Sequence, residues 1–186
     1  MPTQEPEFRE VPPDVYEREW RAIHDSIFSG RLLPENRPFR HATWPMFLFP
    51  YGLNMDEREF DAIAQAAMEQ GDNEFIVEPD VIGFSEPGAL LPWSYSVLDT
   101  VCPTVLGQLD THLFGRSGSW GIVCDVEDYS CIGGEASFMD RVVALLGGAK
   151  AIRKRFLRFA TEEYPFDKEF LDTLLKVVGW NIRVDR

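Results

Sequence analysis

The segment 114–134, with the sequence FGRSGSWGIVCDVEDYSCIGG, constrains the fold of this chain more than any other stretch. It contains a Gly/Ser turn, two short apolar runs and a closing Gly-Gly pair without interruption. The acidic stretch 125–128 separates the two apolar runs, and paired glycines accept the positive φ that a sharp exit requires. We therefore predict a β-hairpin with its tip at residues 125–128.

The first strand of this hairpin has one apolar face. Side chains alternate across a strand, so Trp120, Ile122 and Cys124 point to the same side. A helix should follow the hairpin, because Phe138 and Val142 recur at helical spacing with further apolar residues. We expect Trp120 to be buried beneath that helix.

The register of the hairpin determines whether Cys124 and Cys131 can pair. A two-residue loop of Glu127 and Asp128 would place the two cysteines directly opposite each other, close enough for a disulfide after small adjustments. Such loops favour Asn-Gly or Asp-Gly, because positive φ is needed. We therefore expect a longer tip with an odd number of residues. The two cysteines should then be unpaired, one packed in the core and the other facing away.

The cysteine content also bears on location. Three cysteines cannot all pair, and the sequence shows neither a signal-peptide pattern nor a run of about 18 apolar residues. These features favour a reducing, cytoplasmic setting in which all three thiols are free.

The order of the expected elements predicts an α+β fold, with helices packed on a small, mostly antiparallel sheet. Residues 1–12 are rich in Pro and Glu, and we expect this segment to be largely disordered or draped over the surface. The remaining chain, 13–186, should form a single globular α+β domain, because 45% hydrophobic content in 186 residues is ample for one core.

Capping boxes, apolar stripes and Gly or Pro stops locate the helices. Asp14 with Glu17 and Asn54 with Glu57 form two such boxes, and His24 lies off the apolar stripe of the first helix, as a solvated residue would. The predicted helices cover residues 14–29, 55–70, 103–113, 138–146, 149–163 and 168–178. Further strands are predicted at 44–49, 75–77, 81–82, 93–98 and 180–184, with Pro79 indicating an edge strand or a bulge.

The formal charge of −13 argues against nucleic acid or an anionic membrane as the main partner, because binding to either needs clustered Lys and Arg. Residues 41–140 hold seventeen acids and two bases, and residues 141–186 hold six acids and ten bases. The acidic middle either pairs with the basic C-terminal part within one fold or forms an exposed surface for a basic partner. On the second interpretation the candidate partner-binding residues are Asp72, Glu74, Glu78, Asp80, Asp125, Glu127 and Asp128.

Motifs that would carry catalysis are absent from the sequence: there is no GxSxG, P-loop, GxGxxG, HExxH or CxxC. The acids of residues 72–80 lack the central glycine and final glutamate of a calcium loop, so we expect no metal. The GRSGS segment 115–119 precedes a strand, and we interpret it as a turn instead of an anion cradle. We therefore expect no catalytic residue and no cofactor, although a Cys124 and His112 pair stays open as the weaker alternative.

The predicted helix 149–163 is strongly basic. In isolation it would suit a phosphate-rich ligand, but in so acidic a chain we favour a surface helix that balances neighbouring carboxylates. Its basic residues are Lys150, Arg153, Lys154, Arg155 and Arg158.

The stretches 120–123 (WGIV), 127–129 (EDY) and 133–134 (GG) resemble a recurrent pattern in small acidic bacterial proteins, some of them immunity proteins that accompany secreted toxins. The similarity covers roughly residues 110–146, and its motif is structural, with no catalytic residue. The resemblance implies a protein that blocks a basic toxin through complementary charge.

Two hypotheses about function follow. The first is a cytoplasmic, acidic, non-enzymatic protein that neutralises a cognate basic toxin by direct binding, with no role for nucleic acid or a membrane. The alternative is a small enzyme or ligand-binding domain with a pocket near His41, Trp44 and Trp93, or near Cys124.

Overall fold

The computed structural model describes residues 9–30, 33–79, 88–101, 110–125 and 129–180. Seven strands form one sheet in the order β1-β4-β3-β5-β6-β7-β2, and every neighbouring pair is antiparallel. The strands are β1 (Arg9–Glu10), β2 (Met46–Pro50), β3 (Glu74–Pro79), β4 (Ala89–Pro92), β5 (Thr111–Gly115), β6 (Trp120–Asp125) and β7 (Tyr129–Gly134). The helices are α1 (Pro13–Glu19), α2 (Arg21–Ile27), η1 (Gly52–Asn54), α3 (Glu57–Glu69), α4 (Tyr95–Val101), α5 (Ala136–Leu145), α6 (Ala149–Arg158), η3 (Phe159–Glu163) and α7 (Lys168–Val177).

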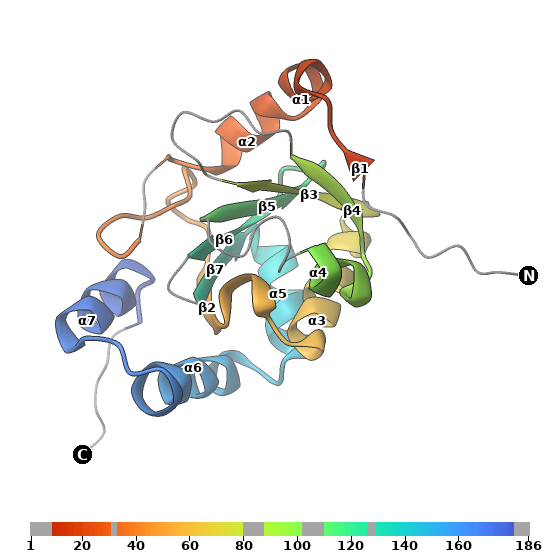
Figure 1. The fold of residues 1–186 in the computed structure, drawn as a ribbon. Helices are drawn as coiled ribbons and strands as arrows, with labels where there is room; N and C mark the ends of the chain where they lie inside the picture. Colours follow the sequence, from red (N-terminus) through yellow and green to blue (C-terminus); the bar gives the residue numbers. More distant parts are fainter. Residues whose placement is uncertain (1–8, 31–32, 80–87, 102–109, 126–128, 181–186) are drawn as a thin grey trace, which may run out of the picture.

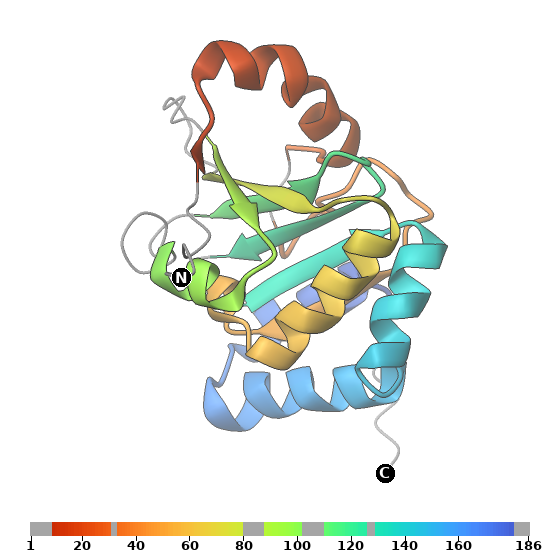
Figure 2. The ribbon, with the colours of Figure 1, turned by 90° about the vertical axis from the view of Figure 1, so that its right-hand side faces the viewer.

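The sheet lies between two layers of helices. Helices α1 and α2 cover one face, and α3, α4 and α5 cover the other, as Figure 1 shows. Helix α6 packs against β2 at the far end of the second layer, and Figure 2 shows this layer from the side. The α+β prediction is therefore confirmed, although the sheet, with seven strands, is larger than expected.

The hairpin is formed by β6 and β7. Asp125 pairs with Tyr129, so three residues lie between the paired positions, which confirms the odd-numbered tip. Cys124 lies opposite Ser130, and Cys131 therefore points to the other face of the sheet. Neither Cys124 nor Cys131 forms a disulfide, and both are buried, so the expectation that one of them faces away from the core is wrong. The reason is that helices or loops cover the sheet on both sides.

Trp120 is completely buried, as predicted, and its ring stacks on the ring of Phe138 in α5 at a centroid distance of 5.6 Å. The next residue, Gly121, points to the opposite face. A Cβ atom on Gly121 would lie 2.8 Å from side-chain carbons of both Ile27 and Phe28, so the missing side chain allows the end of α2 to lie directly on the strand.

The N-terminal part differs from the prediction. Residues 9–12 are ordered, because β1 pairs with β4 and Val11 is buried, whereas residues 1–8 lie outside the described residues. The predicted helix 14–29 is divided into α1 and α2 at Trp20. Pro12 occupies the N-cap position, and Asp14 makes no capping hydrogen bond.

Helix α3 begins two residues later than its predicted cap. Asp56, and not Asn54, is the N-cap residue, and its side chain accepts a hydrogen bond of 2.8 Å from the backbone N–H of Glu59. Asn54 belongs to the short helix η1. The sequence holds two overlapping acid-rich cap patterns, and the second of them, Asp56 with Glu59, starts the helix.

Three short apolar segments were predicted wrongly. No strand was predicted at the position of β4, and α4 overlaps the segment 93–98 that was expected as a strand. Residues 111–113 belong to β5 and not to a helix. Periodicity alone does not separate buried strands from buried helix turns in such short runs. Pro79 ends β3, which lies between β4 and β5, so it marks neither an edge strand nor a bulge there.

The C-terminal helices α5, α6 and α7 follow the predicted order, and Asp167 caps α7 by accepting from the backbone N–H groups of Glu169 and Phe170. Several predictions lie outside the described residues. They are the strands at 81–82 and 180–184, apart from Trp180, the helical segment 103–109, and the thiol of Cys102.

Candidate functional site

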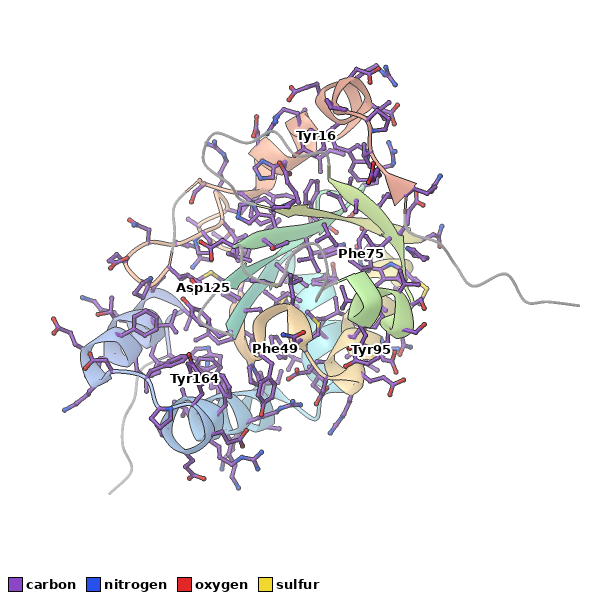
Figure 3. The ribbon with its side chains drawn as sticks, viewed as in Figure 1. Tyr16, Phe49, Phe75, Tyr95, Asp125 and Tyr164 are labelled. Carbon is purple, nitrogen blue, oxygen red and sulfur yellow. The ribbon has the colours of Figure 1, made fainter. Side chains whose placement is uncertain are left out.

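A pocket of about 560 Å³ lies between the end of β2, the start of α3 and the helices α6 and η3. This volume is in the usual range for small-molecule sites. Phe49, labelled in Figure 3, belongs to its apolar lining. The lining residues are Phe49, Pro50, Tyr51, Asp56, Arg58, Glu59, Leu146, Ala151, Ile152, Lys154, Arg155, Arg158, Phe159 and Glu163.

Helix α6 presents one side to the pocket through its helical spacing. Ala151, Lys154, Arg155 and Arg158 are separated by three or four residues, so they lie along one strip of the helix. The neighbouring buried strip, which includes Phe156, holds α6 in place against the protein interior. The basic helix noted in the sequence therefore places three of its five cations around a cavity.

Glu59 is the most unusual side chain of the pocket. It is only 1% exposed, and one oxygen of its carboxylate is 3.2 Å from Arg155. The same guanidinium lies 2.6 Å from Asp56. These ion pairs join the first turn of α3 to α6, across almost a hundred residues of sequence. The other carboxylate oxygen, Oε2, is buried without a hydrogen-bond partner among the described residues.

Burial raises the pKa of Glu59 to about 7, because a carboxylate away from water loses hydration in its charged form. Arg155 lowers this pKa, whereas the neighbouring charge of Asp56 raises it. A carboxyl group that titrates near neutral pH at the edge of a cavity is typical of functional sites, although structural ion pairs also shift pKa values.

Tyr51 and Glu163 also belong to the lining of the pocket and bond to each other. The Tyr51 hydroxyl donates a hydrogen bond to Glu163, which also accepts a bond of 2.7 Å from Arg158. Tyr51 has a φ of 67°, the left-handed conformation that non-glycine residues seldom adopt. Glu163 ends the π-helical turn η3, a rare form that is frequent at functional sites. Two rare backbone features thus meet in this part of the pocket lining.

Two cations of the pocket, Arg58 and Lys154, have no ion-pair partner among the residues that the structure describes. Both side chains are exposed. The guanidinium of Arg58 lies near the turn between α5 and α6, where a Cβ atom on Gly147 would be 4.0 Å from it.

The predicted partner-binding residues do not share one exposed face. Asp72 is 3% exposed, so it does not belong to an acidic surface. Glu74 is ion-paired with Arg9. Glu78 is half-buried, accepts a hydrogen bond from Tyr16 and lies 3.8 Å from Arg21. Asp125, labelled in Figure 3, is half-buried and accepts a 3.2 Å hydrogen bond from Tyr129. Asp80, Glu127 and Asp128 lie outside the described residues.

Asp72 instead fills the GRSGS turn. Its carboxylate accepts hydrogen bonds from the backbone N–H and the hydroxyl of Ser117, at 2.8 and 2.6 Å, and from the indole of Trp120 at 2.7 Å. A Cβ atom on Gly115 would lie 2.1 Å from this carboxylate. The donors of the turn therefore bond to a carboxylate of the same chain. This agrees with the interpretation of GRSGS as a structural turn.

A histidine pair between α2 and β5 was not predicted. His24 is half-buried, so it is not the solvated residue that its position off the stripe indicated. Its Nε2 lies 3.0 Å from Nδ1 of His112, and the ring of His112 stacks on Phe28 at 4.2 Å. Burial lowers the pKa of His112 to about 3. The two histidines are 88 residues apart, so no local pattern could reveal the pair.

Among the described residues, the structure does not bring His41 and Trp44 together with Trp93. The ring of Trp44 stacks on His41, and that of Trp93 lies 5.6 Å from Trp120. Trp44 also contacts Phe39, which packs on the opposite face of the sheet from Trp120. Cys124, the other proposed centre, is 2% exposed on the Trp120 face. His112 and Cys124 therefore point to opposite faces of the sheet, because His112 pairs with Val123.

Comparison with protein-family models, curated proteins and solved structures gave no match. Among the helices in the described parts of the chain, none is long and apolar enough to cross a membrane. The described residues also contain no cluster of three or more His, Cys, Asp or Glu side chains placed to hold a metal ion.

Proposed function

We propose that this protein is a ligand-binding protein that holds a small molecule in the pocket between α3 and α6. The observation that carries the proposal is Glu59, a nearly fully buried carboxylate with an unpartnered oxygen on a cavity of about 560 Å³. Unpartnered buried polar atoms are rare in folded proteins, because each costs free energy. Oε2 itself is closed to solvent, so in this proposal the Glu59 side chain turns towards a bound molecule whose N–H or O–H group then satisfies the oxygen. No catalytic step is part of the proposal.

A pocket-filling variant tests the proposal. Ala151 is exposed and lines the pocket, so Ala151→Trp should fill the cavity without disturbing the core. Nile red, a neutral dye whose emission rises in apolar surroundings, is the probe. The parent protein should bind the dye saturably, and Ala151→Trp should weaken binding about tenfold or more.

The control is Ala22→Trp, on an exposed position of α2 that does not line the pocket. It should bind Nile red as the parent protein does. Equal binding by both variants, or no saturable binding by the parent protein, would contradict the proposal. Circular dichroism of each variant establishes that the fold is intact.

A second candidate function is an immunity-type protein that binds a basic toxin in the cytoplasm. The observation that favours it is the charge of −13, which the pocket does not explain. The absence of a disulfide at Cys124 and at Cys131 is consistent with a reducing compartment. Of the predicted surface, Glu74, Glu78 and Asp125 are the described members that retain exposure.

The product of the neighbouring gene is the partner to test. If the second proposal holds, the two proteins form a complex, and Glu74→Lys with Asp125→Lys slows association several-fold and weakens its salt dependence. Glu169→Lys with Asp172→Lys, on exposed positions of α7, is the matched control. Absence of a complex, or equal rates for both double variants, contradicts the proposal.

A further inference from the structure

The pocket proposed as a binding site has an apolar lining that would contact the body of a ligand. Its apolar side chains come from the sheet, from the end of α5 and from α6 with η3. They are Phe49, Pro50, Leu146, Ile152 and Phe159. A ligand that covers them removes apolar surface from water, which favours binding by roughly 25 cal/mol for each Å². A purely polar ligand would not gain the free energy of burying this apolar surface.

The pocket lining contains four cationic and three acidic side chains. Arg155 is shared by Asp56 and Glu59, at 2.6 and 3.2 Å, and Arg158 is paired with Glu163 at 2.7 Å. The three acids of the lining therefore all have a cation in contact. The remaining two cations, those of Arg58 and Lys154, are the ones without an ion-pair partner among the described residues.

We infer that the ligand of this pocket is a small organic anion, with an apolar body and one carboxylate or phosphate group. This inference rests on the proposed function and adds the chemical class of the ligand. A guanidinium offers a planar pair of N–H donors that matches a carboxylate or a phosphate, and an ammonium adds a point charge. Arg58 and Lys154 together supply both kinds of donor beside an apolar wall.

A matched series of three compounds tests the class of ligand. Phenyl phosphate has both the apolar ring and the anion, benzyl alcohol has only the ring, and inorganic phosphate has only the anion. Titrations followed by calorimetry or by ligand NMR should show phenyl phosphate binding about tenfold or more tightly than either partial compound. Benzoate in place of phenyl phosphate then distinguishes a carboxylate from a phosphate ligand.

Paired variants connect the result to the two cations. Arg58→Gln with Lys154→Gln should weaken phenyl phosphate binding about tenfold and leave benzyl alcohol binding unchanged. Arg40→Gln with Lys150→Gln is the control, since it also removes one exposed Arg and one exposed Lys, neither of which lines the pocket. The control should bind phenyl phosphate as the parent protein does.

Different outcomes of these experiments would contradict the anionic class of the ligand and the proposed binding function. If benzyl alcohol binds as tightly as phenyl phosphate, and Ala151→Trp abolishes both, the pocket binds ligands but the anionic class is wrong. The same conclusion follows if the two pairs of variants weaken phenyl phosphate binding equally. If neither Nile red nor any compound of the series binds, the proposed function is wrong as well.

Discussion

Asp72 shows how a single side chain can determine the role of a loop. The GRSGS turn has the backbone N–H groups and hydroxyls of an anion site, and the carboxylate of Asp72 occupies it with three hydrogen bonds. Two donors of Ser117 and the indole of Trp120 would lose this acceptor if the carboxylate were removed. Hydrogen bonds to charged groups contribute about 1.5–3 kcal/mol each, and their sum is not additive.

We expect Asp72→Ala to lower the free energy of unfolding by about 3 kcal/mol or more, because it leaves buried donors without an acceptor. Urea denaturation is the measurement. Asp61→Ala, on the exposed side of α3, is the control and should change the stability by less than about 0.5 kcal/mol. Equal losses in the two variants would mean that the Asp72 bonds are not what holds the turn.

The raised pKa of Glu59 predicts how the stability of the folded protein depends on pH. Its pKa is about 7 in the folded protein against an ordinary value of 4.5 for a glutamate side chain, so the folded state holds this proton more tightly than the unfolded state. The resulting stabilisation is fully present below pH 4.5 and is lost as the pH rises through 7. The loss is on the order of 3 kcal/mol for a group that is this deeply buried.

We therefore expect Glu59→Gln to gain stability relative to the parent protein as the pH rises from 4.5 to 8, by about 2–3 kcal/mol. The measurement is the difference between two urea denaturation series, in which the other titrating groups cancel. Glu57→Gln, an exposed change in the same helical turn, is the control. A difference for Glu59→Gln that stays constant with pH would contradict the assignment.

Helices and strands were predicted correctly where the hydrophobic periodicity and the boundary residues of the segment are clear. The β6–β7 hairpin and helices α5 to α7 have strong periodicity and Gly, Pro or Asp boundaries, and all of them were predicted. Strand β4, α4 and β5 are short apolar runs whose state depends on pairing with β3 and on packing, so their prediction failed. The pocket joins residues of α3 and α6 that are about a hundred positions apart, and only its basic helix was visible in the sequence.

The hairpin makes a prediction about thiol reactivity. Cys124 and Cys131 are buried on opposite faces of the sheet, and burial raises the pKa of the Cys131 thiol to about 12. Because the thiolate is the reactive form, we expect iodoacetamide to leave both residues unmodified in the folded protein and to modify both in urea without a reductant. Peptide mapping separates them from Cys102. A Cys124–Cys131 disulfide, or rapid modification in the folded protein, would overturn the observed register.

The contact between α2 and β5 is sensitive to acid. His112 stacks on Phe28 and bonds to His24, and burial lowers the pKa of His112 to about 3 from 6.5. The unfolded chain therefore takes up this proton first, so the stability that neutral His112 gives is present above pH 6.5. It is lost as the pH falls towards 3, at up to about 1.4 kcal/mol per pH unit.

We expect the ring resonances of His112 in NMR spectra of the folded protein to show no titration between pH 7.5 and 4.5. The spectrum of His112→Gln assigns the signal. A midpoint above pH 5 would show that His112 is accessible to water, and the packing of α2 on the sheet would then be looser than the structure has it.

The chain has a large net charge, and most of the ion pairs among its described residues are exposed or partly exposed. The formal charge is −13, and the ion pairs that join the acidic middle to the C-terminal part, such as Arg141 with Glu69, are partly exposed. Exposed pairs contribute little stability, with a median of about 0–1 kcal/mol. The pairs of Arg155 with Asp56 and Glu59 support the interpretation that part of the acidic charge is balanced within the fold. The larger part remains as mutual repulsion.

We therefore expect salt to stabilise this protein. Raising NaCl from about 20 to 200 mM shortens the screening length from roughly 20 Å to about 7 Å, which weakens long-range repulsion more than contact pairs. The Tm should rise by about 2–4 °C, which corresponds to a gain of about 1 kcal/mol for a chain of this size. Replacing the exposed acids Asp61, Asp140 and Asp172 by Asn should reduce this rise. Replacing the exposed bases Arg40, Lys150 and Lys176 by Gln should increase the rise in Tm, because the net charge becomes more negative.

A Tm that falls with NaCl in the parent protein would contradict this prediction, because attractive ion pairs would then outweigh the repulsion. The acidic charge would in that case be balanced within the fold and would not be left for a partner.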